Sequence, residues 1–378
     1  MDFGLTQDQE MLARSAREFL EQESSTAVIR RIIEDPHAFS PELFRKVVEQ
    51  GWTGLLVPEA YGGLGLTMLD AAVLLTELGR ALTPVPILSS AVLATSLLCS
   101  AASTAQKKEW LPRLASGEVL ATVAWLEESD RLDPAGVTLR PRRVRGGFRL
   151  AGSKLFVLDA AIAHVLLVAA RTGPGNGESG ITLLLVPRDT PGVTVTPLPT
   201  IDPTRRVYEV VFDDVTVPPE RVIGTEGKGW KHLARLVDVA CVAIAAESQG
   251  GAERALQMAV EYVKVREQFG RPVGSFQAVK HMAAECTSEI EPSRSLLWYA
   301  AWALQGNPRD ASRAAAMAKA RLGDVYSRTT NTAVQMHGGI GFTWEHDIHF
   351  WFKRAKCNEV AFGSPSWHRE RVATLSGW

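Results

Sequence analysis

Two short motifs in the second half of the chain combine residue types that suit a dinucleotide. The first is Arg266-Glu267-Gln268-Phe269-Gly270 and the second is Gln335-Met336-His337-Gly338-Gly339-Ile340-Gly341. A guanidinium offers a planar fork of donors to phosphate oxygens, and an aromatic face can stack on a base. Glycine lets backbone amides approach an anion without a Cβ in the way. The two motifs therefore predict contacts to a pyrophosphate and an adenine.

Composition excludes several classes of partner. The 378 residues carry 41 Lys and Arg against 42 Asp and Glu, so the net charge of −1 predicts neither nucleic acid nor an anionic membrane as a partner. The four cysteines (Cys99, Cys241, Cys286 and Cys357) form no CxxC pair, as expected of a reduced cytoplasmic protein. The first residues lack a basic segment followed by an apolar one, and we expect no membrane insertion.

The hydrophobic pattern divides the chain into three parts. Helical periodicity runs from Thr6 to about Gly117, β-strand patterns follow, and helical periodicity returns beyond Gly229. We therefore predict a helical domain over residues 1–118, a β domain over 119–225 and a helical bundle over 226–378. The stretch 87–102 is too short and polar to span a bilayer and predicts a buried helix. Strands are predicted at 137–140, 142–144, 148–150, 165–170, 181–186, 193–196 and 207–212.

This domain order and the two motifs resemble the FAD-dependent acyl-CoA dehydrogenase family across essentially the whole chain. The resemblance is extended by Phe276-Gln277-Ala278-Val279-Lys280-His281 after the first motif and by Phe342 and Glu345 after the second. It implies an α+β fold with an N-terminal helical domain, a middle β-barrel or sandwich domain and a C-terminal four-helix bundle. It also implies that one set of residues binds the FAD of a neighbouring subunit: Arg266, Phe269, Gln277, Gln335, Gly338 and Gly339. Without this context, each motif would be typical of a helix C-cap or a plain turn.

Other stretches depart from the family pattern. Phe350 stands where a basic residue is expected and Arg354 where an acid is expected. The stretch 125–133, which matches the family's flavin-wrapping loop, has no glycine, and its extra carboxylates would repel phosphate. Phe156 and Leu158 stand where family members place a tryptophan and a hydroxyl residue against the isoalloxazine, so the ring packing is kept and the hydrogen bond is lost.

The catalytic glutamate of the family is absent from both of its usual positions. The family removes a proton from the carbon α to a thioester, which requires a carboxylate in a dry pocket. The commoner position matches Phe362, the rarer one matches Ala240, and Cys241 replaces the arginine expected next to it. Glu247 lies on the same helix face as Ala240, about 10 Å farther along the axis, and is a weaker candidate base than it is a paired structural residue. The catalytic residue therefore stays unknown, and no metal site is predicted, because the spacing of His281, His337, His346 and His349 supports none.

These observations favour a subunit of a heteromeric acyl-CoA dehydrogenase, in which a related chain holds most of the FAD and supplies the base. The expected assembly is α2β2, acting on a fatty or sterol side-chain acyl-CoA, with electron-transfer flavoprotein as the electron acceptor. One alternative is a self-sufficient homotetramer that uses a non-standard base such as Glu247. Two others are a reduced-flavin monooxygenase of the same fold and a non-enzymic scaffold. Which acyl group is used cannot be read from the sequence.

Overall fold

The structure, a computed structural model, describes residues 4–378, which form two compact units. The bundle unit comprises residues 4–31, 68–83 and 240–378, and the sheet unit comprises residues 32–67 and 84–239. Both motifs predicted to bind a dinucleotide lie in the bundle unit, whereas the stretch 125–133 lies in the sheet unit.

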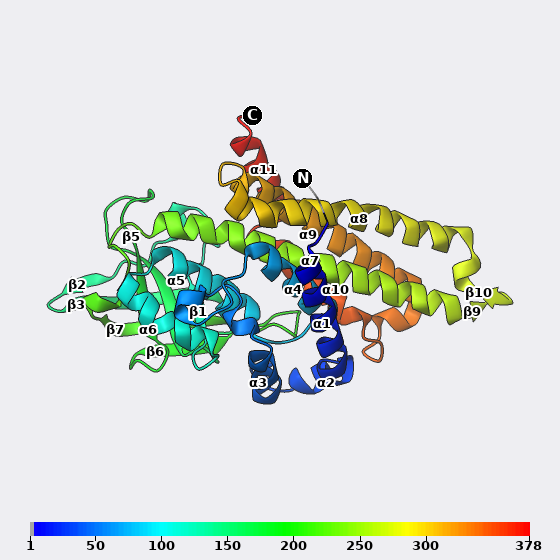
Figure 1. Ribbon diagram of the computed structural model, residues 1–378, viewed down its shortest axis with the longest axis horizontal. Coiled ribbons are helices and arrows are strands. Elements are labelled where there is room, and N and C mark those ends of the chain that lie inside the picture. Colours follow the sequence, from blue (N-terminus) through cyan, green and yellow to red (C-terminus); the bar gives the residue numbers. More distant parts are fainter. Residues whose placement is uncertain (1–3) are drawn as a thin grey trace. The chain divides into compact units, whose positions relative to one another are not determined.

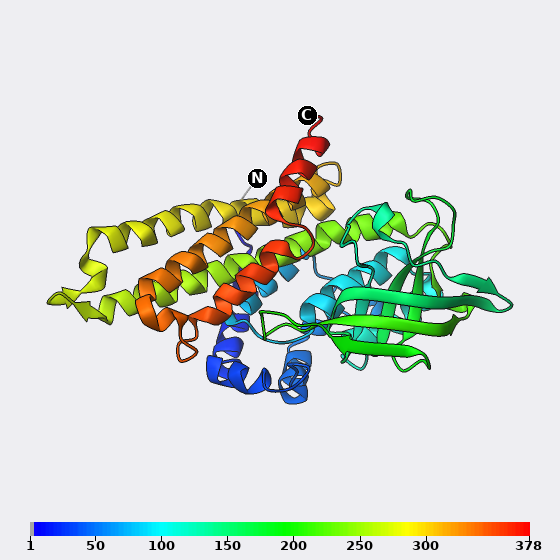
Figure 2. The same ribbon diagram turned by 180° about the vertical axis from the view of Figure 1, so that it is seen from behind.

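Long helices make up the bundle unit (Figures 1 and 2). They are α1 (Gln7–Glu23), α2 (Thr26–Ile32), α4 (Met68–Ala81), α7 (Trp230–Val265, from residue 240 on), α8 (Gln277–Gly306), α9 (Ala311–His337), α10 (Ile348–Val360) and α11 (Pro365–Leu375). Helix α9 packs against α8, α10 and α11, and α4 packs against α1 and α8. The ribbon of β9 (Glu267–Gln268) and β10 (Arg271–Pro272), with the 3₁₀ turn Val273–Ser275, leads from α7 to α8, and the 3₁₀ turn η7 (Gly338–Phe342) follows α9.

Small residues let these helices approach closely. The alanines between Arg313 and Ala320 on α9 are buried. A Cβ on Gly250 of α7 would lie 1.8 Å from the backbone oxygen of Thr76 on α4, and one on Gly79 would lie 2.1 Å from the backbone oxygen of Glu247. The backbones of α4 and α7 are thus in direct contact, which no larger side chain would allow.

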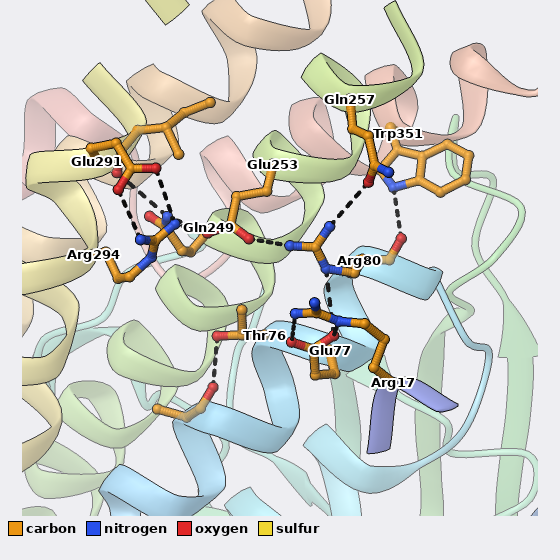
Figure 3. Close-up of polar contacts among 12 residues, drawn as sticks. Arg17, Thr76, Glu77, Arg80, Gln249, Glu253, Gln257, Glu291, Arg294 and Trp351 are labelled. Carbon is orange, nitrogen blue, oxygen red and sulfur yellow. Dashed lines mark hydrogen bonds and ion pairs between the residues drawn. The ribbon is translucent and has the colours of Figure 1, made fainter. Parts of the chain in front are cut away.

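A row of ion pairs joins four helices of the bundle unit (Figure 3). Arg17 of α1 lies 2.7 Å from Glu77 of α4, and Glu77 also lies 3.4 Å from Arg80. Glu253 of α7 pairs with Arg80 and, at 2.9 Å, with Arg294 of α8. Because Glu77 is buried, its charge is stable there only with these two guanidinium partners.

The sheet unit contains two four-stranded sheets and several short helices. Its strands are β1 (Ala121–Ala124), β2 (Arg142–Val144), β3 (Gly147–Leu158), β4 (Val165–Arg171), β5 (Ile181–Pro187), β6 (Val193–Pro197), β7 (Val207–Val217) and β8 (Val222–Ile223). Its helices are α3 (Pro41–Glu49), the π-helix η3 (Ile87–Ala94), α5 (Thr95–Ala101) and α6 (Thr104–Ala115), with 3₁₀ turns at Trp52–Gly54, Glu59–Tyr61, Pro134–Gly136 and Pro219–Arg221. The strand orders are β1-β4-β5-β8 and β2-β3-β7-β6, and only the β1–β4 pair is parallel.

The apolar core of the sheet unit lies between these two sheets. It contains Leu166 and Val168 of β4 from one sheet and Leu150 of β3 and Val210 of β7 from the other. The predicted strands at 165–170, 181–186, 193–196 and 207–212 are confirmed as β4 to β7. Those predicted at 142–144 and 148–150 are confirmed within β2 and β3, which form a hairpin with Val144 opposite Gly147. In the first sheet, Leu166 faces Val186 and Leu167 faces Leu185.

The predicted strand at 137–140 is wrong. The segment has no regular structure, because the amides of Thr138 and Leu139 donate to the carboxylate of Glu127, each 3.0 Å away. A side chain thus replaces the neighbouring strand that these amides would otherwise bind. The predicted buried helix at 87–102 is present, but its first half is wound as the π-helix η3 and its second half is α5. No helix of the described residues is both long enough and apolar enough to cross a bilayer.

Candidate active and cofactor-binding site

The first motif forms an exposed end of the bundle unit. Helix α7 ends at Val265, and the amide of Arg266 still donates to the carbonyl of Tyr262, 2.9 Å away. The guanidinium of Arg266 is exposed, and Phe269, in a left-handed conformation with φ 56°, is 90% exposed. A large aromatic side chain left in water is unfavourable unless a ligand or another chain covers it.

Residues of the neighbouring strand and helix support this end of the ribbon. The guanidinium carbon of Arg271 lies 4.1 Å from the ring centroid of Phe276, and the ring of Phe269 lies edge-on to the same ring at 6.1 Å. Gln277 begins α8 and is exposed, with its amide nitrogen 3.5 Å from Nε2 of His281. Arg266, Phe269 and Gln277 are therefore presented together on the ribbon and the helix that follows it.

The second motif forms a glycine turn at the end of α9. Gly338 ends the helix with φ 63°, and among residues 4–378 a Cβ on Gly338 or Gly339 would meet no atom within 4 Å beyond its immediate chain neighbours. Gln335, one turn earlier, is exposed. Gly341 differs, because its Cβ would lie 2.7 Å from the carbonyl oxygen of Val334. The backbone of the first two glycines is thus open to a ligand, while the third closes the turn against α9.

Aromatic stacking brings the two motifs together. The ring of Tyr262, on the last turn of α7, stacks on that of His337 at 4.8 Å, and the ring of His346 lies 4.3 Å from that of His337. Nδ1 of His337 donates to the carbonyl of Ala333 at 2.7 Å, whereas its buried Nε2 has no partner among the described residues. Burial lowers the pKa of His337, so the ring is neutral at pH 7.

The turn that holds Phe362 is fixed by two buried side chains. Lys319 of α9 donates to the carbonyl of Gly363 at 2.8 Å and to that of Glu359 at 3.1 Å. His368 of α11 donates Nε2–H to the carbonyl of Phe362 at 2.9 Å, since a carbonyl can only accept. Burial lowers the pKa of Lys319 to about 8 and, with Lys319 nearby, that of His368 to about 3. Phe362 itself is half-buried and has φ 55°.

The other candidate base positions offer no exposed carboxylate. Ala240 and Cys241 are buried on α7, and Sγ of Cys241 lies 3.6 Å from Nε2 of His368. Because this Nε2 carries the proton donated to Phe362, His368 cannot accept a proton from Cys241 at that atom. Glu247 is only 5% exposed and lies where Gly79 of α4 packs on α7.

In the sheet unit, the stretch 125–133 is organised by a buried ion pair. Nζ of Lys154 lies 2.6 Å from the carboxylate of Glu127 and donates to the carbonyl of Trp125 at 3.1 Å. Burial lowers the pKa of Lys154 to about 8, against the attraction of Glu127. Burial opposes the charged form of Glu127 as well, but Lys154 and the bonds from Thr138 and Leu139 hold its pKa below the usual value. This carboxylate is therefore neutralised and repels a phosphate less than the sequence alone suggests.

Asp133 of this stretch and Phe156 and Leu158 of β3 also have defined surroundings. Asp133 pairs with Arg131 and caps the 3₁₀ turn Pro134–Gly136 by accepting from the amide of Ala135. Phe156 lies at an irregularity in the pairing of β3 with β7 and is 46% exposed, with φ 55°. The carbonyl of Leu158 accepts a hydrogen bond from Thr122 of β1 at 2.6 Å. The backbone near Leu158 is thus fixed, although its side chain offers no donor.

The exposed residues of the two motifs were predicted from the sequence, whereas the buried polar residues that fix the turn at Phe362 and the stretch 125–133 were not. Lys319 and His368 were not predicted to matter, although a lone lysine in an alanine-rich helix is a signal of a buried partner. The pairing of Lys154 with Glu127 joins residues 27 positions apart, which no local pattern indicates.

Comparisons with known proteins agree with this architecture. Family models described as the N-terminal, middle and C-terminal domains of acyl-CoA dehydrogenase match residues 6–118, 122–215 and 227–375. The chain is 30% identical to an acryloyl-CoA reductase (NADH) of Anaerotignum propionicum, over 99% of this chain and 95% of that one. It therefore belongs to the acyl-CoA dehydrogenase family, and its enzyme class and its FAD cofactor follow from that membership.

Solved structures give the same result. Butyryl-CoA dehydrogenase from Megasphaera elsdenii superposes with a TM-score of 0.93 at 30% identity, over 100% of both chains. The ChsE4–ChsE5 complex from Mycobacterium tuberculosis gives a TM-score of 0.89 at 29% identity, over 100% of this chain and 99% of that one. The predicted fold class is thus confirmed. The glycine turn with free space before it and the exposed aromatic and guanidinium fit one end of FAD.

Proposed function

We propose that this chain is the partner subunit of a heteromeric acyl-CoA dehydrogenase. It supplies Arg266, Phe269, Gln277, Gln335, Gly338 and Gly339 to the adenine and pyrophosphate of FAD held mainly by a related chain. This proposal rests on a contrast within the bundle unit, between the residues proposed to bind the nucleotide and the positions where the family has its catalytic base. The nucleotide-facing residues are exposed and pre-formed, whereas Phe362 and Ala240 stand where a base is needed.

The base must come from elsewhere in the assembly. FAD, when bound, would supply the acceptor for the hydride of the β carbon, and a carboxylate would have to take the proton from the α carbon of the acyl group. A phenyl ring and a methyl group cannot hold that proton. Glu247 is a poor substitute, because it lies in the contact between α4 and α7, where Gly79 leaves no room for a Cβ. We infer that the related chain provides the glutamate and most of the flavin cradle.

Arg266 and Phe269 have separate roles in this proposal. The exposed guanidinium has donors available for pyrophosphate oxygens, and bonds to a charged acceptor contribute about 1.5–3 kcal/mol each. Phe269 covers the adenine with a face that is otherwise in water. The open backbone at Gly338 and Gly339 lets amides approach the phosphates.

The names of similar proteins support the proposed substrate class and the proposed partner chain. Butyryl-CoA dehydrogenase and acryloyl-CoA reductase are named for acyl-CoA thioesters, and the ChsE4–ChsE5 complex joins two chains. We propose an α2β2 assembly that desaturates a fatty or sterol side-chain acyl-CoA. Another similar solved structure concerns the electron-transferring flavoprotein of Acidaminococcus fermentans, and a flavoprotein of this kind is the proposed electron acceptor.

Co-expression tests the proposal. The chain is purified alone and with related acyl-CoA dehydrogenase chains encoded near its gene, and FAD per chain and acyl-CoA oxidation are measured. We expect little FAD and no oxidation for the lone chain, and both for the complex. Arg266→Ala in the complex should weaken FAD binding about tenfold to a hundredfold. Lys264→Ala, an exposed cation two residues earlier, is the matched control and should have little effect. Stoichiometric FAD and turnover in the lone chain would refute the heteromer.

A further inference from the structure

The loop after the glycine turn exposes large aromatic side chains. Phe342 is 80% exposed and Trp344 is 57% exposed, and Phe269 of the first motif adds a third exposed ring to the same unit. Single exposed apolar residues are ordinary, but two exposed aromatics within three positions of one loop are typical of a surface that another molecule covers.

Trp344 is held in place although it faces solvent. Its ring stacks on that of His349 at 4.5 Å with an interplanar angle of 21°, and Phe350 meets it edge-on at 5.7 Å. Nζ of Lys353 lies 4.4 Å from the centre of the same ring. Burial, with Lys353 and Arg30 nearby, lowers the pKa of His349 to about 4, so this imidazole is neutral at pH 7. A side chain immobilised before binding loses little entropy when a partner covers it.

Arg30 fixes the backbone of the same loop. Its Nε donates to the carboxylate of Asp347 at 2.8 Å, and its Nη2 donates to the carbonyl of Trp344 at 2.8 Å. The guanidinium carbon also lies 5.0 Å from the ring centroid of Phe350. Phe350 stands where the family pattern has a basic residue. In this chain its ring instead packs against a cation from another helix, the guanidinium of Arg30 on α2. The departure thus creates a rigid aromatic platform at this position.

We propose that Trp344 anchors the interface with the related acyl-CoA dehydrogenase chain whose FAD lies on the glycine turn. This inference rests on the proposed function. The related chain is the expected partner of Trp344 because this residue is continuous with the glycine turn. Trp344 is six residues after Gly338, and the loop between them includes η7. A chain that places its nucleotide on Gly338 and Gly339 must come within contact distance of this loop. Rigid tryptophans flanked by arginine are the residue types that dominate such interfaces.

The test uses the co-expressed complex with Trp344→Ala. Its dissociation constant is measured by sedimentation over a dilution series, and we expect at least tenfold weaker association. Trp302→Ala is the matched control, since Trp302 is 38% exposed on α8 of the same unit. It lies 25 residues after Gln277, roughly 37 Å along the helix axis, and its replacement should leave association within twofold. Urea unfolding of each chain establishes that both variants fold.

A second variant separates the ring from its support. Arg30→Gln removes the cation that holds the loop and keeps Trp344, so we expect an intermediate loss of association. Trp344→Phe should recover part of the loss seen with alanine.

The possible outcomes are distinct. Unchanged association of the Trp344→Ala complex would overturn this inference and leave the proposed function standing. If Trp344→Ala weakened the self-association of this chain and left the heteromer unaffected, the partner at Trp344 would be a second copy of this chain, and the proposed related chain would be wrong. Turnover by the lone chain would refute the proposed function whatever Trp344 does.

Discussion

Replacement of Lys319 by methionine should change how stability depends on pH. Lys319 is fully buried, and burial lowers its pKa from 10.5 to about 8. Between these two values the unfolded chain binds a proton that the folded chain does not, so the free energy of unfolding rises with pH. Each pKa unit corresponds to about 1.4 kcal/mol, and integration from pH 7 to 9.5 gives about 2 kcal/mol of added stability for the wild type. The methionine variant lacks this gain.

Urea unfolding at pH 7, 8.5 and 9.5 measures this difference. The free energy of unfolding of the variant is subtracted from that of the wild type at each pH, which cancels groups common to both chains. Cys241 lies close enough to Lys319 to affect its charge, so the comparison is repeated with Cys241→Ala in both chains. The difference should increase by about 2 kcal/mol over this range in either background.

A difference that stays constant from pH 7 to 9.5 would refute the reasoning. It would mean that Lys319 keeps an ordinary pKa, through water or a local opening of the turn that holds Phe362. A difference that vanishes once Cys241 is replaced would assign the titration to the thiol.

Three other substitutions test separate parts of the structure. Glu127→Gln leaves the buried ammonium of Lys154 without its counter-charge and should cost about 3–5 kcal/mol, measured by urea unfolding at pH 7; a loss below 1 kcal/mol would contradict the ion pair. Gly250→Ala forces α4 away from α7 and should cost about 3 kcal/mol or more, whereas Gly177→Ala, with free space around it, should change the thermal midpoint little. Phe362→Glu should not make the lone chain oxidise butyryl-CoA or longer acyl-CoA, because a carboxylate alone does not rebuild the flavin loop; measurable turnover would show that only the base was missing.

Local sequence patterns predicted elements whose bonds are local. Thr6 and Gln9 form a capping box with two reciprocal bonds at 3.0 and 3.3 Å, at the point where the sequence predicts that helical periodicity begins. Ser40 caps α3, which has Pro41 at its start. The hairpin at Gly146 and Gly147 was equally readable, since turn chemistry is set by neighbouring residues.

Long-range polar contacts could not be read in this way. Glu127 and Lys154 look like ordinary charged residues of a surface loop and a strand, and only the fold places both in the interior. The same pair explains the wrong strand at 137–140, whose amides bind a carboxylate eleven or twelve positions away. Arg30 and Asp347 are 317 positions apart, so no local sequence pattern predicts that Arg30 supports the loop of Trp344.

The candidate site was predictable where side chains are exposed and glycines are open. Arg266, Phe269 and Gly338 were identified from their motifs together with the resemblance to the family, and each is accessible. Their proposed role in binding FAD stays a prediction. The turn around Phe362 shows the limit of this reasoning. The missing carboxylate was evident from the sequence, but the bonds from Lys319 to the carbonyls of Glu359 and Gly363 join residues 40 and 44 positions apart, which no local pattern indicates.

The edges of the sheet β2-β3-β7-β6 affect how this protein behaves at high concentration. The edge strand β2 has three residues and exposes Arg142 and Arg143, and the other edge, β6, ends at Pro197. Short, charged or proline-terminated edges resist the addition of a foreign strand, which is the first step of fibrillar aggregation. This sheet is therefore a poor template for strand addition between crowded copies of the chain.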